Sequence, residues 1–333
     1  MTLFDIFIFS LNAIMPIICI ILLGYFLKYI GFLTKDFLKI GNKLVFRLCL
    51  PVMLFMNIAE LKSFSGIPWN AVIYVLAVIA VLVLIGLLIA LLTPDPNQKG
   101  VMMQCIFRSN FALIGVPLAE LIGGSEGVTA AAIMSAFTIP IYNILAVTVL
   151  TVFKQGKASF SMKEQLKQII RNPLIIGVVS GIFVLVLKLT VATHIPQQVF
   201  ADFAFIKTTL VYISRSATPL SLLVLGGQFE FSKLQGYKKQ LIIGTTGRII
   251  IAPTIGVGIA ILLTRLGVVN FTPAVFAALI SLFATPVAVA SAIMAEEMEN
   301  DGQLAAQLVV WTSLFSVFTL FGFIFLSRLW GVI

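Results

Sequence analysis

The sequence predicts an all-α integral membrane protein with about ten transmembrane helices, arranged as two inverted five-helix repeats. Three observations lead to this fold class. Apolar residues occupy 60% of the 333 positions and charged residues 11%, whereas a soluble domain carries about 25% charged residues. The apolar residues fall into runs that can cross a bilayer, which takes about 20 residues in a helix. A set of residues also recurs in the second half of the chain, which indicates an internal repeat.

Apolar runs separated by glycine, proline or charged residues indicate the individual spans. No polar stretch is long enough for a soluble domain, so residues 1–333 are expected to form one membrane domain. The first run has no basic n-region and no small-residue cleavage motif, so it is interpreted as a span and not as a signal peptide. The expected spans are approximately 5–27, 38–59, 69–92, 99–122, 127–153, 172–189, 205–229, 239–264, 273–295 and 303–328.

Basic residues predict the orientation in the membrane. Most lysines between spans lie in the odd-numbered connections, and basic loops stay in the cytoplasm. Both termini are therefore expected outside, in a multi-pass protein of the cytoplasmic membrane that contacts lipid. The same rule explains the net charge of +9, and no basic-aromatic surface indicates nucleic-acid binding. The lysines and arginine that carry this prediction are Lys28, Lys35, Lys39, Lys99, Lys154, Lys157, Lys163, Lys167, Arg171, Lys233, Lys238 and Lys239.

Three residues of the second span recur at one common offset in the seventh span. This match predicts a first five-helix repeat at 1–153, a linker at 154–171 and a second repeat at 172–333. Five is an odd number, so the second repeat must be inverted, which is typical of carriers with alternating access. The linker is interpreted either as a short amphipathic helix or as a solvated basic segment. The recurring residues are Lys39, Arg47 and Pro51, matched by Lys207, Arg215 and Pro219.

Two short stretches predict broken helices. The fourth span contains Arg108–Pro117 and the ninth contains Leu282–Val287, and each has a proline. Lipid cannot satisfy the main-chain groups that a broken helix exposes, so such breaks face protein, a cavity or a solute. A pair of breaks in the two halves is typical of a carrier whose half-helix N-termini bind an anion near the midplane. A proline that only kinks each helix is the alternative interpretation.

These stretches supply the candidate substrate-binding residues. Gly115 and Ala284 are small enough for a solute to approach the backbone, while Asn110 and Thr285 offer polar groups. Asn143 in the fifth span would complete the site, or it would hydrogen-bond to another helix instead. The candidate substrate-binding residues are Asn110, Ile114, Gly115, Val116, Pro117, Asn143, Ala284, Thr285 and Pro286.

Charged residues inside the spans supply further candidates. Arg47 and Arg215 recur in both halves and are expected to gate or steer anions, together with Arg108. Arg108 and Arg248 are interpreted either as lining the solute path or as snorkelling to the headgroups. Glu120 is the candidate for binding a coupling ion, with a water-facing carboxylate as the alternative.

No residue pattern indicates an enzyme, a metal or a cofactor. Cys19, Cys49 and Cys105 lie in apolar segments without a CxxC pair, and the single histidine, His194, is expected in a loop. The segment Gly123–Gly127 has the spacing of a serine nucleophile motif but is expected to be a loop. We therefore expect no catalytic activity, no metal site and no cofactor.

The motifs named above, together with Pro16, Gly24-Tyr25 and Gly31, resemble those of the auxin efflux carrier family. That family belongs to the superfamily of the bile acid, arsenite and riboflavin transporters. The resemblance implies inverted repeats, fourth and ninth helices that cross at their prolines, elevator-like movement and organic anion substrates. It further implies a homodimer.

The short 154–171 linker resembles that of bacterial members of the family, whereas plant members have a long cytoplasmic loop. This resemblance implies a secondary transporter, or permease, for a carboxylate similar to malate or malonate, or similar to auxin. The alternative within transport is a sodium-coupled symporter of the bile acid carrier type. A channel is disfavoured because inverted repeats with paired broken helices suit alternating access.

Overall fold

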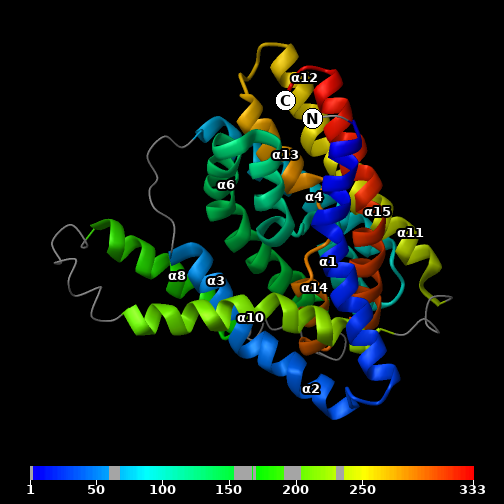
Figure 1. Ribbon diagram of the computed structural model, residues 1–333. Helices are drawn as coiled ribbons and strands as arrows, with labels where there is room; N and C mark the ends of the chain where they lie inside the picture. Colours follow the sequence, from blue (N-terminus) through cyan, green and yellow to red (C-terminus); the bar gives the residue numbers. More distant parts are fainter. Residues whose placement is uncertain (1–2, 60–67, 154–166, 168–169, 191–203, 230–235) are drawn as a thin grey trace.

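The computed structural model describes residues 3–59, 68–153, 167, 170–190, 204–229 and 236–333 (Figure 1). Within these ranges, the regular secondary structure is helical apart from one isolated β-bridge between Ser109 and Val287. The prediction of an all-α membrane protein is confirmed. His194 and most of the 154–171 linker lie outside the described residues, so the structure does not test the expectations for them.

The first half of the chain contains helices at the first five predicted spans. The second and fourth spans are interrupted by π-helical turns, and α6 joins two helices across a kink at Gly124, whose φ is +59°. An L side chain rarely adopts that φ, which explains the glycine there. The elements are α1 (Leu3–Tyr29), α2 (Lys35–Leu44), η1 (Val45–Cys49), α3 (Leu50–Ala59), α4 (Trp69–Leu92), α5 (Pro96–Phe107), η2 (Phe111–Gly115) and α6 (Val116–Val152).

The second half contains helices at the other five predicted spans. The eighth span has two π-helical turns, and the ninth is divided by six non-helical residues between α13 and α14. The elements are α8 (Pro173–Thr190), α10 (Ala204–Gln228), α11 (Lys238–Thr246), η4 (Gly247–Ile251), η5 (Thr254–Gly258), α12 (Ile259–Arg265), α13 (Pro273–Phe283), α14 (Ala290–Glu297) and α15 (Gly302–Leu329).

Side-chain caps set the start of several helices. The Asp95 carboxylate accepts from the Asn97 N–H at 2.9 Å, and the Asp301 carboxylate accepts from the Leu304 N–H at 2.9 Å. Thr272 accepts from the Val275 N–H at 3.3 Å, directly before Pro273 at the first position of α13. These contacts satisfy N–H groups that have no partner inside the helix, so the sequence fixes where α5, α13 and α15 begin.

Within the described ranges, five helices are long and apolar enough to cross a membrane: 69–92, 118–152, 204–228, 238–265 and 302–329. Shorter apolar helices occupy 18–29, 173–188 and 273–283. Large apolar side chains on these helices are exposed, including Leu88 on α4 and Phe318 on α15. Exposed apolar surface of this extent fits a lipid environment, and the chain is a multi-pass membrane protein.

The helices form two groups that matter for the site. In the crossing group, α4, α5, α6, α12, α13 and α15 pack around buried Phe107, Phe276 and Phe283, and α11 and α14 pack on α15. In the α10 group, α3 packs on α8, and α10 packs on α1, α2 and α3. Helix α1 also packs on α15, which joins the two groups. Both chain ends lie at the same end of the molecule, opposite the α1–α2 turn (Figure 1).

Glycines allow α1 and α10 to approach closely. A Cβ on Gly24 would collide with the main-chain carbonyl of Leu223, and a Cβ on Gly226 would collide with that of Ile21. Small residues at such contacts are a common way to pack membrane helices, because lipid provides no hydrophobic drive between them. This contact fixes α10, which forms one wall of the candidate site.

Candidate functional site

The fourth and ninth spans are both broken in the interior of the molecule. Helix α5 ends at Phe107 and the chain becomes helical again at Phe111. Helix α13 ends at Phe283 and α14 begins at Ala290. The two non-helical segments, 108–110 and 284–289, are called the crossing below. The expectation that both spans contain broken helices is therefore confirmed.

The two segments of the crossing pair with each other. Ser109 forms an isolated antiparallel bridge with Val287, and the Asn110 N–H donates to the Pro286 carbonyl at 2.8 Å. Ser109, Asn110 and Val287 are all buried. Because an unsatisfied main-chain group is costly in a membrane, each segment stabilises the other where its helix is interrupted.

The expectation that both breaks lie at prolines is wrong for the fourth span. Pro286 lies inside its break, but Pro117 follows the other break and stands at the start of α6. The π-helical turn η2 lies between the 108–110 break and Pro117. In it, the Gly115 N–H donates to the Asn110 carbonyl and the Val116 N–H donates to the Phe111 carbonyl, each across five residues. Because proline has no N–H, the wider turn ahead of Pro117 costs no additional hydrogen bond. The break itself is set by the pairing of Ser109 with Val287.

Each second half-helix begins at the crossing. The first internal hydrogen bonds of η2 are those from the Ile114 and Gly115 N–H groups to the Asn110 carbonyl, at 3.0 and 3.2 Å. In α14, the first come from the Ser291 and Ala292 N–H groups. N–H groups ahead of these bonds point out of each helix, and a helix N-terminus carries partial positive charge. The N-termini of η2 and α14 therefore meet at the crossing.

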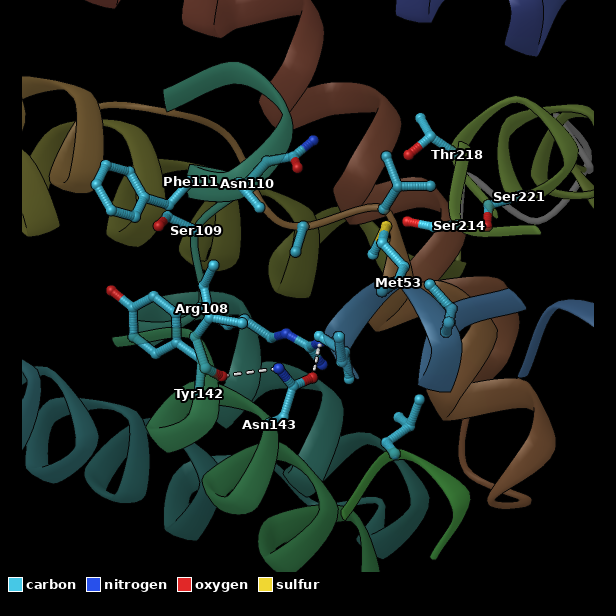
Figure 2. A pocket seen from close by; sticks show the side chains of 18 of the residues that line it. Met53, Arg108, Ser109, Asn110, Phe111, Tyr142, Asn143, Ser214, Thr218 and Ser221 are labelled. Atoms are coloured by element: carbon cyan, nitrogen blue, oxygen red, sulfur yellow. Dashed lines mark hydrogen bonds between the residues drawn. The ribbon is translucent and has the colours of Figure 1, made fainter. Parts of the chain in front are cut away.

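A cavity of about 470 Å³ opens at these N-termini, between the crossing and helices α3, α6, α8 and α10. Its volume lies within the range of about 300–1,000 Å³ typical of small-molecule sites. We call it the crossing cavity. Figure 2 shows Asn110 on one side and Ser214 and Thr218 of α10 on the other. The lining residues that carry polar side-chain groups are Arg108, Ser109, Asn110, Tyr142, Asn143, Ser214, Arg215, Thr218 and Ser221.

The Asn110 side chain is the clearest candidate for binding a ligand in the crossing cavity. It is 7% exposed, and its Nδ2 atom has no hydrogen-bond partner within the described residues. A buried amide donor without a partner costs about 1–3 kcal/mol. The cost is avoided when an oxygen in the cavity accepts from Nδ2, so this donor is available to a bound solute.

Arg108 brings a full positive charge to the cavity wall. One terminal nitrogen donates to the Asn143 Oδ1 atom at 2.8 Å (Figure 2). The other terminal nitrogen donates to the Met294 sulfur. The Asn143 Nδ2 atom donates to the Ile139 carbonyl at 2.7 Å, which fixes which end of the amide faces Arg108. Asn143 thus positions the guanidinium without adding a negative charge.

The other predicted site residues have different positions. Ile114 and Gly115 are buried in η2, and Ala284 and Thr285 are fully buried in the crossing, so the cavity lining includes none of these four. Val116 and Pro286 also fall outside the lining, as do Arg47 and Glu120, which are exposed. The side chain of Pro117 is not among those that the structure describes, so the prediction for it is not tested. Arg248 is fully buried and outside the lining, so both alternatives for it, snorkelling and lining the solute path, are wrong.

Several lining residues were not among the predicted ones. Ser214, Thr218 and Ser221 follow each other at intervals of four and three residues, so they share one face of α10 with the cavity. A row of polar residues on one face of an apolar span could have predicted that this face of α10 lines a cavity. The apolar lining residues Met53 and Leu174 carried no such signal, because nothing distinguishes them from other residues of their helices.

A second, wider hollow of about 700 Å³ lies at the N-terminal ends of α4 and α13 and beside the Gly124 kink of α6. Its lining includes Trp69, Glu126, Asn270 and Thr272, and no predicted site residue. Asn270 is exposed there. Among its described lining residues the hollow has no arginine, and Glu126 adds an acidic group that the lining of the crossing cavity does not have.

Comparisons with known proteins find membrane transport proteins that are similar to this chain. A family described as "Membrane transport protein" matches residues 9–324. The chain is 24% identical over 335 residues to an uncharacterized transporter of Methanothermobacter thermautotrophicus, covering 98% of this chain and 99% of that protein. It is 25% identical over 326 residues to an uncharacterized transporter of Methanocaldococcus jannaschii, covering 95% and 99%. Both relatives are archaeal, and their names give no substrate.

Proposed function

The chain belongs to the membrane transport protein family, which is the auxin efflux carrier family, and from that premise we propose a secondary carrier for a small organic anion. As a family member it is a membrane transporter. The observation that carries the proposal is the crossing cavity, where two half-helix N-termini and Arg108 meet beside the unpartnered amide of Asn110.

The charge around the crossing cavity favours an anion. Each helix N-terminus contributes about half a positive elementary charge, and Arg108 and Arg215 contribute one each. None of the residues that line the cavity in the described part of the chain is acidic. Arg108 is buried, so water screens its charge and those of the N-termini little, whereas Arg215 is exposed and acts through a partly screened field. A carboxylate is the anion that best matches two N-termini and an amide donor.

The apolar wall defines the rest of the ligand. Opposite the crossing, the cavity is lined by Leu50, Met53 and Leu54 of α3 and by Leu174 of α8. We propose that the carboxylate lies at the crossing while the carbon skeleton contacts this wall. The volume of about 470 Å³ accommodates a malate- or malonate-like acid with water, or an auxin-like aromatic acid. A dicarboxylate would place its second charge near Arg215.

The position of the cavity between the two helix groups supports alternating access. We propose that the crossing group moves against the α10 group in an elevator-like manner and carries the anion with it. Polar contacts at the inter-group boundary that this movement would break include the bond from Asn42 Nδ2 to Glu297 Oε1 at 2.9 Å and the bond from Gln303 Nε2 to the Gln228 carbonyl at 2.9 Å. The inverted repeats at 1–153 and 172–333 would supply the two equivalent end states. This proposal extends to a homodimer with both termini outside the cytoplasmic membrane.

A sodium-coupled symporter is the second candidate. It requires oxygen ligands for Na⁺ near the substrate. Glu120, the predicted coupling residue, is exposed and lies outside the lining of the crossing cavity. The crossing itself offers main-chain carbonyls, which bind Na⁺ in other carriers with broken helices. The coupling therefore has to be measured.

Electrogenic flux tests the proposal directly. We would reconstitute the purified protein in liposomes and record currents induced by malate, malonate and indole-3-acetate, with and without Na⁺ and pH gradients. Saturable currents that fall in an Asn110→Ala variant but persist in an Asn270→Ala variant would support anion transport through the crossing cavity. If none of the three acids gives a current with folded protein, and none enters the liposomes in labelled form by electroneutral transport, the proposed substrate class is wrong. Equal loss in both variants would instead place the site elsewhere.

A further inference from the structure

Arg248 is a buried cation at the crossing, on the side that does not face the cavity. Its side chain is fully buried, and its guanidinium donates to four main-chain carbonyl oxygens within the described residues. No carboxylate accepts from it among these hydrogen bonds. The acceptors are the carbonyls of Ile106 at 3.0 Å, Thr285 at 3.1 Å, Leu282 at 3.4 Å and Phe283 at 2.5 Å.

These four carbonyls belong to the ends of two helices. Ile106 lies in the last turn of α5, Leu282 and Phe283 lie in the last turn of α13, and Thr285 follows in the crossing. A helix C-terminus carries about half a negative charge, so the two ends together carry about one. One guanidinium therefore balances both ends, and this balance explains how a charge is tolerated at full burial.

The local sequence brings Arg248 to this position. It lies in the π-helical turn η4, which changes the direction of side chains relative to a regular α-helix. The preceding residue, Gly247, lets this turn pack directly on α5, because a Cβ there would collide with the Cδ1 atom of Ile106. The turn and the glycine together aim the guanidinium between α5 and α13.

We infer that Arg248 is a built-in cation that occupies a carbonyl site at the crossing, where a dissociable metal cation would otherwise bind. In carriers with broken helices, unwound carbonyls and half-helix C-termini are the ligands of Na⁺ or H⁺. Here the four carbonyls are already occupied by a group attached to the chain. An arginine keeps its proton at any pH that a cell reaches, so this charge does not leave during a transport cycle.

Arg248 also acts on the crossing cavity, through the half-helices and without touching the ligand. Without its charge, the two negative C-termini would oppose an anion held at the adjacent N-termini. Arg248 is thus a positioning residue that holds the ends of α5 and α13 together and keeps the electrostatic potential in the cavity positive. This effect on the anion rests on the proposed function, whereas occupancy of the carbonyl site does not.

Chemical rescue tests the inference. We would measure the Tm of purified wild type, Arg248→Ala and Arg265→Ala in detergent, while equal concentrations of guanidinium, sodium or choline chloride are added in the low millimolar range. Arg265 is exposed at the end of α12 and serves as the matched control. We expect Arg248→Ala to lose roughly 5 to 10 °C, because four carbonyls lose their cation. Guanidinium should restore most of that loss, while the wild type should not distinguish sodium from choline.

A second readout separates positioning from a purely structural role. In Arg248→Ala, guanidinium should tighten malonate binding, and malonate should tighten guanidinium binding by the same factor, because linkage is reciprocal.

The inference is overturned if guanidinium raises the Tm of Arg248→Ala no more than that of Arg265→Ala, or if the wild-type Tm is higher in sodium chloride than in choline chloride. If Arg248→Ala does not fold, Arg248→Lys keeps the charge and should retain a folded protein of intermediate Tm, whereas a Tm equal to wild type would contradict the need for several donors. Failure of malonate binding in the wild type would count against the proposed function alone.

Discussion

The main-chain N–H of Asn110 donates to the main-chain carbonyl of Pro286 at 2.8 Å and joins the fourth span to the ninth. The Asn110 carbonyl is also used, because it accepts from the Ile114 and Gly115 N–H groups. Pro286 has no N–H, so its segment has one donor fewer to satisfy in the membrane. The backbone of Asn110 therefore holds the crossing together, and its side chain is left for the cavity.

Asn110→Ala should weaken anion binding while the fold persists. The main-chain bonds to Pro286, Ile114 and Gly115 do not depend on the side chain. A hydrogen bond to a charged group contributes about 1.5–3 kcal/mol, so we expect the Kd of malonate to rise about 10- to 100-fold. Titration calorimetry would measure it, with Asn270→Ala as the control. A large fall in Tm, or an unchanged Kd, would contradict this role.

Gly115→Ala should destabilise the contact between η2 and α13. A Cβ at this position would lie 2.8 Å from the main-chain oxygen of Ser281 and would collide with the Phe111 ring. Overpacking of this kind costs about 1–3 kcal/mol, so the Tm should fall. Gly258→Ala is the matched control, since a Cβ there meets nothing within 4 Å and alanine is favoured over glycine in a helix by about 0.5–1 kcal/mol. Equal Tm values for the two variants would exclude a close approach at Gly115.

Asn143→Asp should impair anion binding more than Asn143→Ala. The aspartate would form an ion pair with Arg108 in place of the neutral 2.8 Å hydrogen bond and would remove the net positive charge from that wall. Alanine would free Arg108 from its partner but leave the charge. We therefore expect the order wild type, then Ala, then Asp for malonate affinity, measured as Kd. The reverse order of the two variants would show that the charge of Arg108 does not act on the ligand.

Hydropathy, together with the glycine, proline and charged residues between apolar runs, was sufficient to predict where the helices lie, because each helix is a local feature of the chain. The two breaks were also predictable, since an isolated proline in an apolar run marks a weak point in a helix. The location of the first break was not, because it depends on the pairing of Ser109 with Val287, which lies far away in sequence. The role of Arg248 depends likewise on carbonyls from α5 and α13. Helix ends that meet in space leave no pattern in either segment alone.

Arg215 and Arg47 occupy matched positions in the predicted repeats, yet only Arg215 lines the crossing cavity. Both side chains are exposed, so each affects anions through a partly screened field. If Arg215 steers the substrate, Arg215→Gln should raise the KM for malonate about three- to tenfold at low ionic strength, with little change in kcat. The increase should shrink as salt is added, and Arg215→Lys should restore most of the affinity.

Arg47→Gln removes the same charge from the adjacent helix but outside the cavity lining, so it is the control for Arg215→Gln. We expect its KM to stay close to that of the wild type at every ionic strength. Initial currents in liposomes, recorded over a series of malonate and salt concentrations, provide both values. An equal rise of KM in the two variants would mean that the surface potential of the whole molecule concentrates the anion. A rise in Arg215→Gln alone would mean that the charge acts locally, at the mouth of the cavity, where the ligand enters.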